Sequence, residues 1–288
     1  MSRAIKLAKG SANRLQQGPG GRTHAFQAAV RALQQDRSRR GKAMFYGDFK
    51  SEDFSFLQAC LIRFKSIFGT VAYGDNNIII GKTCSFLQDS KLKAAIERHA
   101  TNDQERSLIF RLNTLLWAME NALKIEGDIV ECGVWKGFLF RVLADYFDFA
   151  KIDKTMWLYD TFAGIPAKYD TEKHDNPVLH EENLFEKVVL KFRAYDNIRV
   201  IKGQLPDVLK QRAPQSISLL HLDLNSSRAE IETLDVLFDR VSLGGMIVFD
   251  DYGWSAYKPQ HDAEKDWADK RGYRILEMST GQGLLVKR

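Results

Sequence analysis

Several acidic residues of this chain stand where short apolar runs end. Asp223 follows the run 219–222, and Asp250 and Asp251 follow the run 246–249. If both runs are strands of one sheet, three carboxylates meet at its edge, which is costly unless they are paired, protonated or bound to a cation. Mg²⁺ favours such oxygen ligands and leaves positions for water or substrate. We expect a magnesium site here; the alternative is that Asp250 or Asp251 caps a helix and Asp223 pairs with a lysine.

A second candidate site is the segment 127–137, GDIVECGVWKG. It predicts a strand ending near Glu131, a turn through Gly133 and Gly137, and a helix from Phe138. Glu131 could accept hydrogen bonds from an ammonium group or a ribose, and the glycines would admit a ligand. The spacing is neither the dinucleotide fingerprint nor a P-loop, and Glu131 would repel a phosphate. S-adenosylmethionine, which carries an ammonium and a sulfonium, suits the segment better; a tight turn without ligand is the alternative.

The next two predicted strands add further cofactor candidates. Asp160 ends the second strand, where a carboxylate is suited to a ribose diol, and Phe162 lies just beyond it and could cover the cofactor. Gly203 and Gln204 follow the third strand, where backbone and amide groups could meet an adenine. All four lie at the carboxyl ends of strands, which is where open α/β sheets bind ligands.

The order of predicted elements indicates an α/β fold. Apolar residues recur on one helical face over 105–123, and from there strands and helices alternate, which predicts a mostly parallel, Rossmann-like sheet with helices on both faces. The expected strands are 128–132, 155–159, 198–201, 219–222 and 246–249, and the expected helices are 90–98, 138–147, 182–192, 227–238 and 262–271. The last strands, 273–277 and 283–286, are too close for a parallel crossover, so the final strand must run antiparallel. This is the layout of class I methyltransferases.

With these motifs, the chain from about Arg106 to Arg288 resembles the macrocin O-methyltransferase-like family, S-adenosylmethionine enzymes that use Mg²⁺ to methylate sugar hydroxyls of natural products. The matching pieces are GDIVECGVWKG at 127–137, DTFAGIP at 160–166, HLD at 221–223 and LGGMIVFDDY at 243–252. The resemblance implies Asp223, Asp250 and Asp251 as metal ligands. It implies the segment from Glu131 to Gly137, including Trp135, together with Asp160, as the cofactor shell.

One departure from the family concerns the general base. Family members usually carry a second acid two residues after the first metal ligand, where this chain has Asn225, and an amide cannot take up a proton at neutral pH. Either the metal acidifies the hydroxyl enough for water or another group to serve, or the acceptor is not a sugar diol. His261 and His221 are candidates by residue type, although a lone histidine is more often structural.

Charged residues are unevenly distributed along the chain of 288 residues. Residues 1–43 hold ten Lys and Arg against one Asp, and the remainder holds 32 basic against 36 acidic residues, or −4. We expect a basic, flexible arm over 1–43, an accessory segment over 44–104 and the methyltransferase domain over 105–288. The arm could bind nucleic acid, but a solvated arm is the simpler interpretation because it lacks a cluster of stacking aromatics.

The remaining patterns place the protein in the cytoplasm. Three widely spaced cysteines fit a reducing compartment, and the chain shows neither a membrane span nor a secretory signal. The predicted function is metal-assisted O-methylation of a small-molecule hydroxyl; a non-catalytic scaffold with the same fold is the alternative, and a nucleic-acid methyltransferase is a third interpretation. A homo-oligomer is left open. The polar segment 163–181 is either a lid over the acceptor or an ordinary loop.

Overall fold

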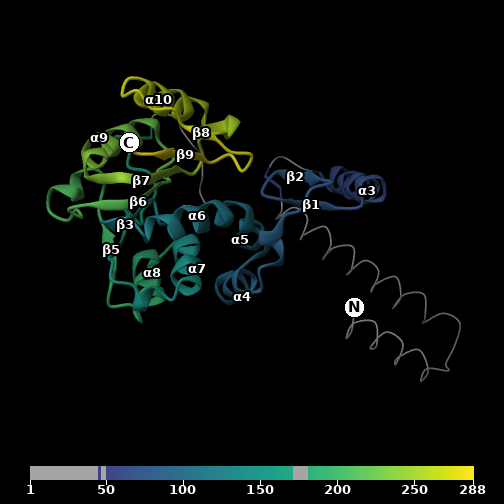
Figure 1. The fold of residues 1–288 in the computed structure, drawn as a ribbon, viewed down its shortest axis with the longest axis horizontal. Helices are drawn as coiled ribbons and strands as arrows, with labels where there is room; N and C mark the ends of the chain where they lie inside the picture. Colours follow the sequence, from purple (N-terminus) through teal and green to yellow (C-terminus); the bar gives the residue numbers. More distant parts are fainter. Residues whose placement is uncertain (1–44, 47–49, 171–180) are drawn as a thin grey trace, which may run out of the picture.

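The computed structural model describes residues 45–46, 50–170 and 181–288 (Figure 1). The predicted basic arm, and with it the nucleic-acid interpretation, lies outside the described residues. Residues 171–180 of the predicted lid segment 163–181 also lie outside the described residues.

A seven-stranded sheet forms the centre of the molecule, with the strand order β5-β4-β3-β6-β7-β9-β8. The pairs from β5 to β7 are parallel, while β9 is antiparallel to both β7 and β8. The predicted class I layout with an antiparallel C-terminal strand is therefore confirmed. The strands are β3 Asp128–Cys132, β4 Met156–Asp160, β5 Ile198–Lys202, β6 Ile217–Leu222, β7 Val241–Phe249, β8 Leu276–Glu277 and β9 Gly283–Val286.

Helices cover both faces of this sheet (Figure 1). On one face, α6, α7 and α8 pack over the sheet around Leu115, Phe140 and Val188. On the other face, α9 and α10 pack around Leu234 and Trp267. Every residue of β6 is buried, as expected for a central strand covered on both faces. The helices are α6 Ile109–Ala122, α7 Phe138–Tyr146, α8 Leu184–Phe192, α9 Ser227–Leu237 and α10 Lys258–Asp269.

Several boundaries differ from the sequence-based expectation, and the strand expected over 273–277 is reduced to β8 at 276–277. The helix expected over 105–123 is divided into α5 Asp103–Ser107 and α6 by Leu108, whose ψ of 8° interrupts the helix. α10 begins at Lys258, four residues early, because Pro259 suits the first turn of a helix. β7 begins at Val241, five residues before the start of the strand expected over 246–249, and continues through Gly244 and Gly245.

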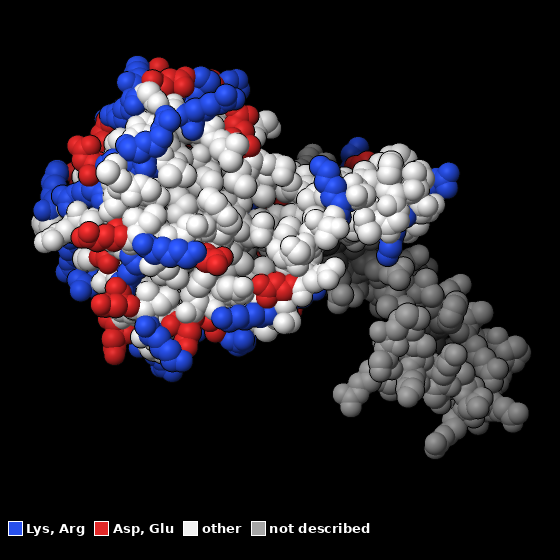
Figure 2. All heavy atoms as spheres, in the orientation of Figure 1, with Lys and Arg blue, Asp and Glu red and all other residues white. Residues whose placement is uncertain are grey.

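A small lobe projects from the body, formed by α3 Ser51–Phe68 and the hairpin of β1 Val71–Gly74 and β2 Asn77–Ile80 (Figure 1). The hairpin turn consists of Asp75 and Asn76, both with positive φ, as the tight primed turns of hairpins require. The visible face of the lobe carries few charges, whereas both signs mix over the body (Figure 2). The lobe also exposes Phe56 and Ile62 of α3.

The helix α4 Ser90–His99 belongs with the body. Its apolar residues Leu92, Ala95 and Ile96 pack against Phe138 and Val142 of α7. The accessory segment predicted over 44–104 is thus split, because the hairpin projects while α4 extends the core. In the described ranges, no helix combines the length and the apolar character needed to cross a bilayer.

Candidate active site

The three predicted metal ligands converge at the carboxyl ends of β6 and β7. Asp223, Asp250 and Asp251 each offer an oxygen, and these atoms lie within 4.8 Å of one another. We call these residues the acidic trio. This spread is close to the separation of ligand oxygens across one hard divalent cation bound at about 2.1–2.5 Å. The donor set therefore fits such a cation.

Burial dominates the electrostatics of the acidic trio. Burial and the charges of Asp250 and Asp251 raise the pKa of Asp223 well above its usual range. Burial also raises the pKa of Asp251 to about 7, although Arg111 opposes this shift. Burial alone would raise the pKa of Asp250 too, but there Arg111 and His221 prevail and hold it below its usual range. The site thus favours a compensating positive charge.

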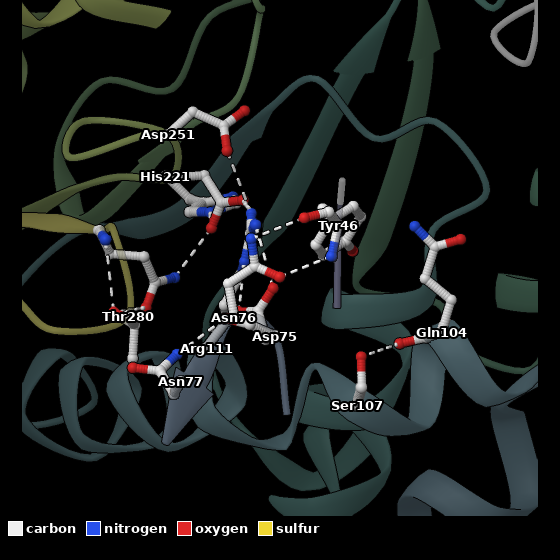
Figure 3. Close-up of polar contacts among 12 residues, drawn as sticks. Tyr46, Asp75, Asn76, Asn77, Gln104, Ser107, Arg111, His221, Asp251 and Thr280 are labelled. Atoms are coloured by element: carbon white, nitrogen blue, oxygen red, sulfur yellow. Dashed lines mark hydrogen bonds and ion pairs between the residues drawn. The ribbon is translucent and has the colours of Figure 1, made fainter. Parts of the chain in front are cut away.

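Arg111, in the first turn of α6, is a site residue that the sequence analysis missed. Its Nη1 atom donates a hydrogen bond to Asp250 and another, of 3.2 Å, to Oδ1 of Asp251. Its Nε atom donates to Oδ2 of Asp75 at 2.9 Å (Figure 3). The alternative in which the trio is partnered by helix capping and a lysine is not what the structure shows, because an arginine partners two of its members.

A cavity adjoins the acidic trio at the ends of β3, β4 and β5. Asp223 lines it, as do six of the eight predicted cofactor residues: Gly133, Trp135, Asp160, Phe162, Gly203 and Gln204. Residues 164–166 and Tyr169 of the predicted lid segment also line it. The Nε1 atom of Trp135 is buried and has no hydrogen-bond partner among the described residues. An unpartnered donor in the wall of a cavity fits a polar ligand such as S-adenosylmethionine.

Asp160 organises the wall of this cavity. Its Oδ2 atom accepts hydrogen bonds from the backbone N–H groups of Val134 and Trp135, both at 2.7 Å, and Oδ1 accepts one of 2.6 Å from Phe162. The β3 turn and the β4 turn are thus held by one carboxylate. Each carboxylate oxygen can accept more than one hydrogen bond, so Asp160 can still receive a hydroxyl.

Packing within the protein requires both glycines of the β3 turn, in addition to the ligand access expected of them. A Cβ atom on Gly133 would lie 1.8 Å from the backbone oxygen of Asp223, and one on Gly137 would lie 3.0 Å from the ring of Phe192. Gly133 therefore permits contact between two strand ends, and Gly137 permits packing of α7 on α8. Gly137 does not line the cavity.

Glu131 is buried and is not among the residues that line this cavity. It is 2 % exposed, and its Oε1 atom is 3.7 Å from Nδ1 of His221, whose Nε2 atom is 3.4 Å from Oδ1 of Asp250. Burial, then the charges of Asp223 and Asp160, raise the pKa of Glu131 well above its usual range. Glu131, His221 and Asp250 form a buried row, and the Oε2 atom of Glu131 has no hydrogen-bond partner among the described residues.

The two predicted catalytic residues differ in their placement. Asn225 lines the cavity, and its Nδ2 atom donates a hydrogen bond of 3.0 Å to Oδ1 of Asp223. His261 lies on α10 with its Nδ1 atom 3.0 Å from Asp262 and its ring 4.5 Å from that of Tyr252. In the described part of the chain His261 contacts neither the cavity nor the trio. The geometry supports a role for Asn225 in orienting Asp223 and gives no support to His261 as a base.

The strand order, the antiparallel β9 and a cavity at the strand ends define a class I methyltransferase fold. The crystal structure of CalS11, calicheamicin methyltransferase, shares this fold at 15% identity and a TM-score of 0.51, covering 85% of this chain and 96% of that one. The family model described as macrocin-O-methyltransferase (TylF) matches residues 107–275, more than half of the chain. The chain belongs to that family, as its motifs indicate.

Relatives include 8-demethyl-8-(2,3-dimethoxy-alpha-L-rhamnosyl)-tetracenomycin-C 4'-O-methyltransferase of Streptomyces olivaceus. That enzyme is 30% identical to this chain, and the match covers 56% of this chain and 66% of the enzyme. Mycinamicin III 3''-O-methyltransferase of Micromonospora griseorubida is 28% identical over 62% of this chain and 76% of its own. Demethyldecarbamoylnovobiocin O-methyltransferase of Streptomyces niveus is 31% identical over 50% and 60%. The chain thus spans three fifths to three quarters of their lengths. The structure of the O-methyltransferase NovP is 26% identical, with a TM-score of 0.53, over 62% and 80%.

Proposed function

We propose that this protein is an S-adenosylmethionine-dependent O-methyltransferase that acts on a hydroxyl of a small molecule, of the sugar or natural-product type. The observation that carries the proposal is that Asp223 belongs both to the wall of the cavity and to the acidic trio. A methyl donor in the cavity and an acceptor hydroxyl at the trio would therefore be neighbours. The named activities of the relatives support the same class of acceptor.

The chain's own residues would act mainly by positioning. Asp160 holds the turns after β3 and β4 in one arrangement through its three backbone hydrogen bonds, and Phe162 and Trp135 lend aromatic surface to a cofactor. S-adenosylmethionine, when bound, supplies the sulfonium methyl group. Holding donor and acceptor in line accounts for several kcal/mol of a methyl-transfer barrier, about 7–11 in well-oriented cases.

The acidic trio would hold the proposed divalent cation, with Mg²⁺ the expected ion. When bound, the cation supplies positive charge that fixes the acceptor oxygen and lowers the pKa of its hydroxyl. Asn225 keeps Asp223 aligned through its 3.0 Å hydrogen bond but cannot itself accept the proton. The proposal includes a cytoplasmic location, because three free cysteines are typical of a reducing compartment.

Titration calorimetry with S-adenosylhomocysteine, with Mg²⁺ and with EDTA, tests the cofactor half. A panel of hydroxylated glycosides with radiolabelled S-adenosylmethionine tests the activity. We expect turnover that requires the metal and is lost in Asp223→Ala, while Asp266→Ala, at an exposed acid paired with Lys270, retains it. Cofactor binding without metal-dependent turnover on any hydroxyl would favour the scaffold alternative, which the missing acid at Asn225 motivates.

A further inference from the structure

Arg111 is a buried cation that already serves the acidic trio. Its side chain is 10% exposed; its Nη1 atom pairs with Asp250 and Asp251, and its Nε atom pairs with Asp75. Figure 3 shows the guanidinium between Asp251 and Asp75. The central carbon of the guanidinium, Cζ, also lies over the ring of Trp254, 5.1 Å from its centroid. A cation in the first turn of a helix is unfavourably placed toward the helix dipole, so these carboxylates must hold it there.

The hydrogen bonds of the trio show which oxygens Arg111 occupies. Both oxygens of Asp250 are engaged, Oδ2 by Arg111 and Oδ1 by the Nε2 atom of Gln282 at 2.8 Å. Oδ1 of Asp251 accepts from Arg111, and Oδ1 of Asp223 accepts from Asn225. A divalent cation at the trio would therefore draw on carboxylates whose charge Arg111 already offsets in part. Two cations that share the same anions and lie close together oppose each other's binding.

The projecting lobe contributes a carboxylate, that of Asp75, which attracts Arg111 away from the acidic trio. Asp75, in the hairpin turn, accepts hydrogen bonds from Nε at 2.9 Å and from Nη2 at 3.3 Å, a two-pronged pairing that fits the planar guanidinium. Asn76 anchors the same turn to Tyr46, with its Nδ2 atom donating to the Tyr46 backbone oxygen at 3.0 Å. The turn conformation thus fixes where Asp75 stands, 36 residues away from Arg111 in the chain.

We propose that Arg111 is an internal counter-cation of the acidic trio, that it competes with the divalent cation, and that Asp75 favours metal binding by taking up Arg111. This inference rests on the proposed metal site. As the metal enters, Arg111 loses attraction to the trio and depends more on Asp75. By thermodynamic reciprocity, metal binding then tightens the contact between the lobe and the body.

Substitutions of Arg111 and of Asp75 are expected to change the affinity for the cation in opposite directions. Arg111→Met removes the competitor, so Mn²⁺ should bind at least about tenfold more tightly, equivalent to about 1.4 kcal/mol. Asp75→Asn removes the carboxylate that draws Arg111 away, so Mn²⁺ should bind several-fold more weakly. If Arg111 merely oriented the carboxylates for the metal, removing it would weaken binding instead.

The test uses the full chain without cofactor and measures free Mn²⁺ by its electron paramagnetic resonance signal, together with thermal unfolding in EDTA and in Mn²⁺. Arg111→Met should unfold at a lower temperature in EDTA and gain more from Mn²⁺ than the unsubstituted protein does. Arg141→Met and Asp145→Asn are matched controls, because they remove one charge of each sign at α7. Both should leave Mn²⁺ binding unchanged.

Each result decides the proposal. Weaker or equal Mn²⁺ binding in Arg111→Met overturns it, and so does equal or tighter binding in Asp75→Asn. If Arg111→Met does not fold, Asp75→Asn alone decides. Binding by Arg111→Met but not by the unsubstituted protein supports the competition and removes the metal from the proposed function. Absence of Mn²⁺ binding in all of them overturns both.

Discussion

The substitution Gly133→Ala tests whether the cavity and the acidic trio depend on one backbone contact. The added Cβ would lie 1.8 Å from the backbone oxygen of Asp223, whereas real Cβ atoms are essentially never found below 3.0 Å. The ends of β3 and β6 would have to separate by about 1.2 Å, the difference between these distances. The N–H group of Asp223 donates a 2.8 Å hydrogen bond to Cys132 in the same place, and this bond would be strained.

The expected cost is the sum of three effects. A residue with a side chain at φ of 93° loses about 1–2 kcal/mol. Weakening the hydrogen bond from Asp223 costs about 1 kcal/mol, and displaced packing at the fully buried strand ends costs about 1–3 kcal/mol. We therefore expect Gly133→Ala to lower the free energy of unfolding by about 3–6 kcal/mol, and also to weaken Mn²⁺ binding because Asp223 moves.

Gly272→Ala is the matched control. Gly272 has a φ of 72°, but apart from its chain neighbours no atom of the described residues lies within 4 Å of the place that an added Cβ would take, so only the backbone penalty of about 1–2 kcal/mol applies. Urea unfolding followed by tryptophan fluorescence in EDTA gives both free energies. Equal losses in the two variants would refute the close approach at Asp223, since both share the same backbone strain.

Three further predictions concern single side chains. Asp160→Asn should weaken S-adenosylhomocysteine binding by about 10- to 100-fold in calorimetry, because the charged acceptor of the Val134 and Trp135 N–H groups is lost; unchanged affinity would contradict its role in the cavity wall. Asn225→Ala should weaken Mn²⁺ binding by about 10- to 100-fold, as for other residues that orient a metal ligand; an unaltered resonance titration would exclude that role. The pKa of Asp251 is raised to about 7, above its unfolded value near 3.9. Protonated Asp251 therefore stabilises the folded state fully below about pH 4, and this stabilisation, at most about 4 kcal/mol, is lost as the pH rises to about 7. As the pH rises over this range, the unfolding temperature in EDTA should fall less steeply in Asp251→Asn than in the unsubstituted protein, and parallel curves would argue against the shift.

The sequence predicted the fold well because the strands of the sheet are short apolar runs that polar residues or glycines end. The strand 128–132 was expected with the bounds that the structure has, since Gly127 and Gly133 stand on either side of it. The trio was predicted for a related reason: carboxyl ends of parallel strands share one edge, so Asp223 and Asp250 had to be near each other.

Arg111 could not be predicted by the same reasoning. Its partners Asp75 and Asp250 are 36 and 139 residues away, and no local period relates them. The signal that was available is its setting between Phe110 and Leu112, both buried, on a helix expected to pack on the sheet. A charged residue between buried neighbours requires a partner, but the sequence does not say which one. For His261, residue type alone suggested a catalytic role, and its position on α10 beside Asp262 and Tyr252 adds no support to that prediction.

The proposed roles of the trio and the cavity are tied together at Asp223. Its backbone oxygen touches Gly133 of the cavity wall, its carboxylate belongs to the trio, and Asn225 reaches that carboxylate from the following turn with a φ of 55°. Asparagine adopts such a backbone more readily than most residues and has an amide to donate, so this position can orient Asp223 without adding a fourth charge. A fourth carboxylate would have raised the repulsion that Arg111 offsets. The exchange of an acid for Asn225 and the presence of Arg111 therefore act in the same direction, toward a less negative site whose charge balance does not depend on the proposed cation alone.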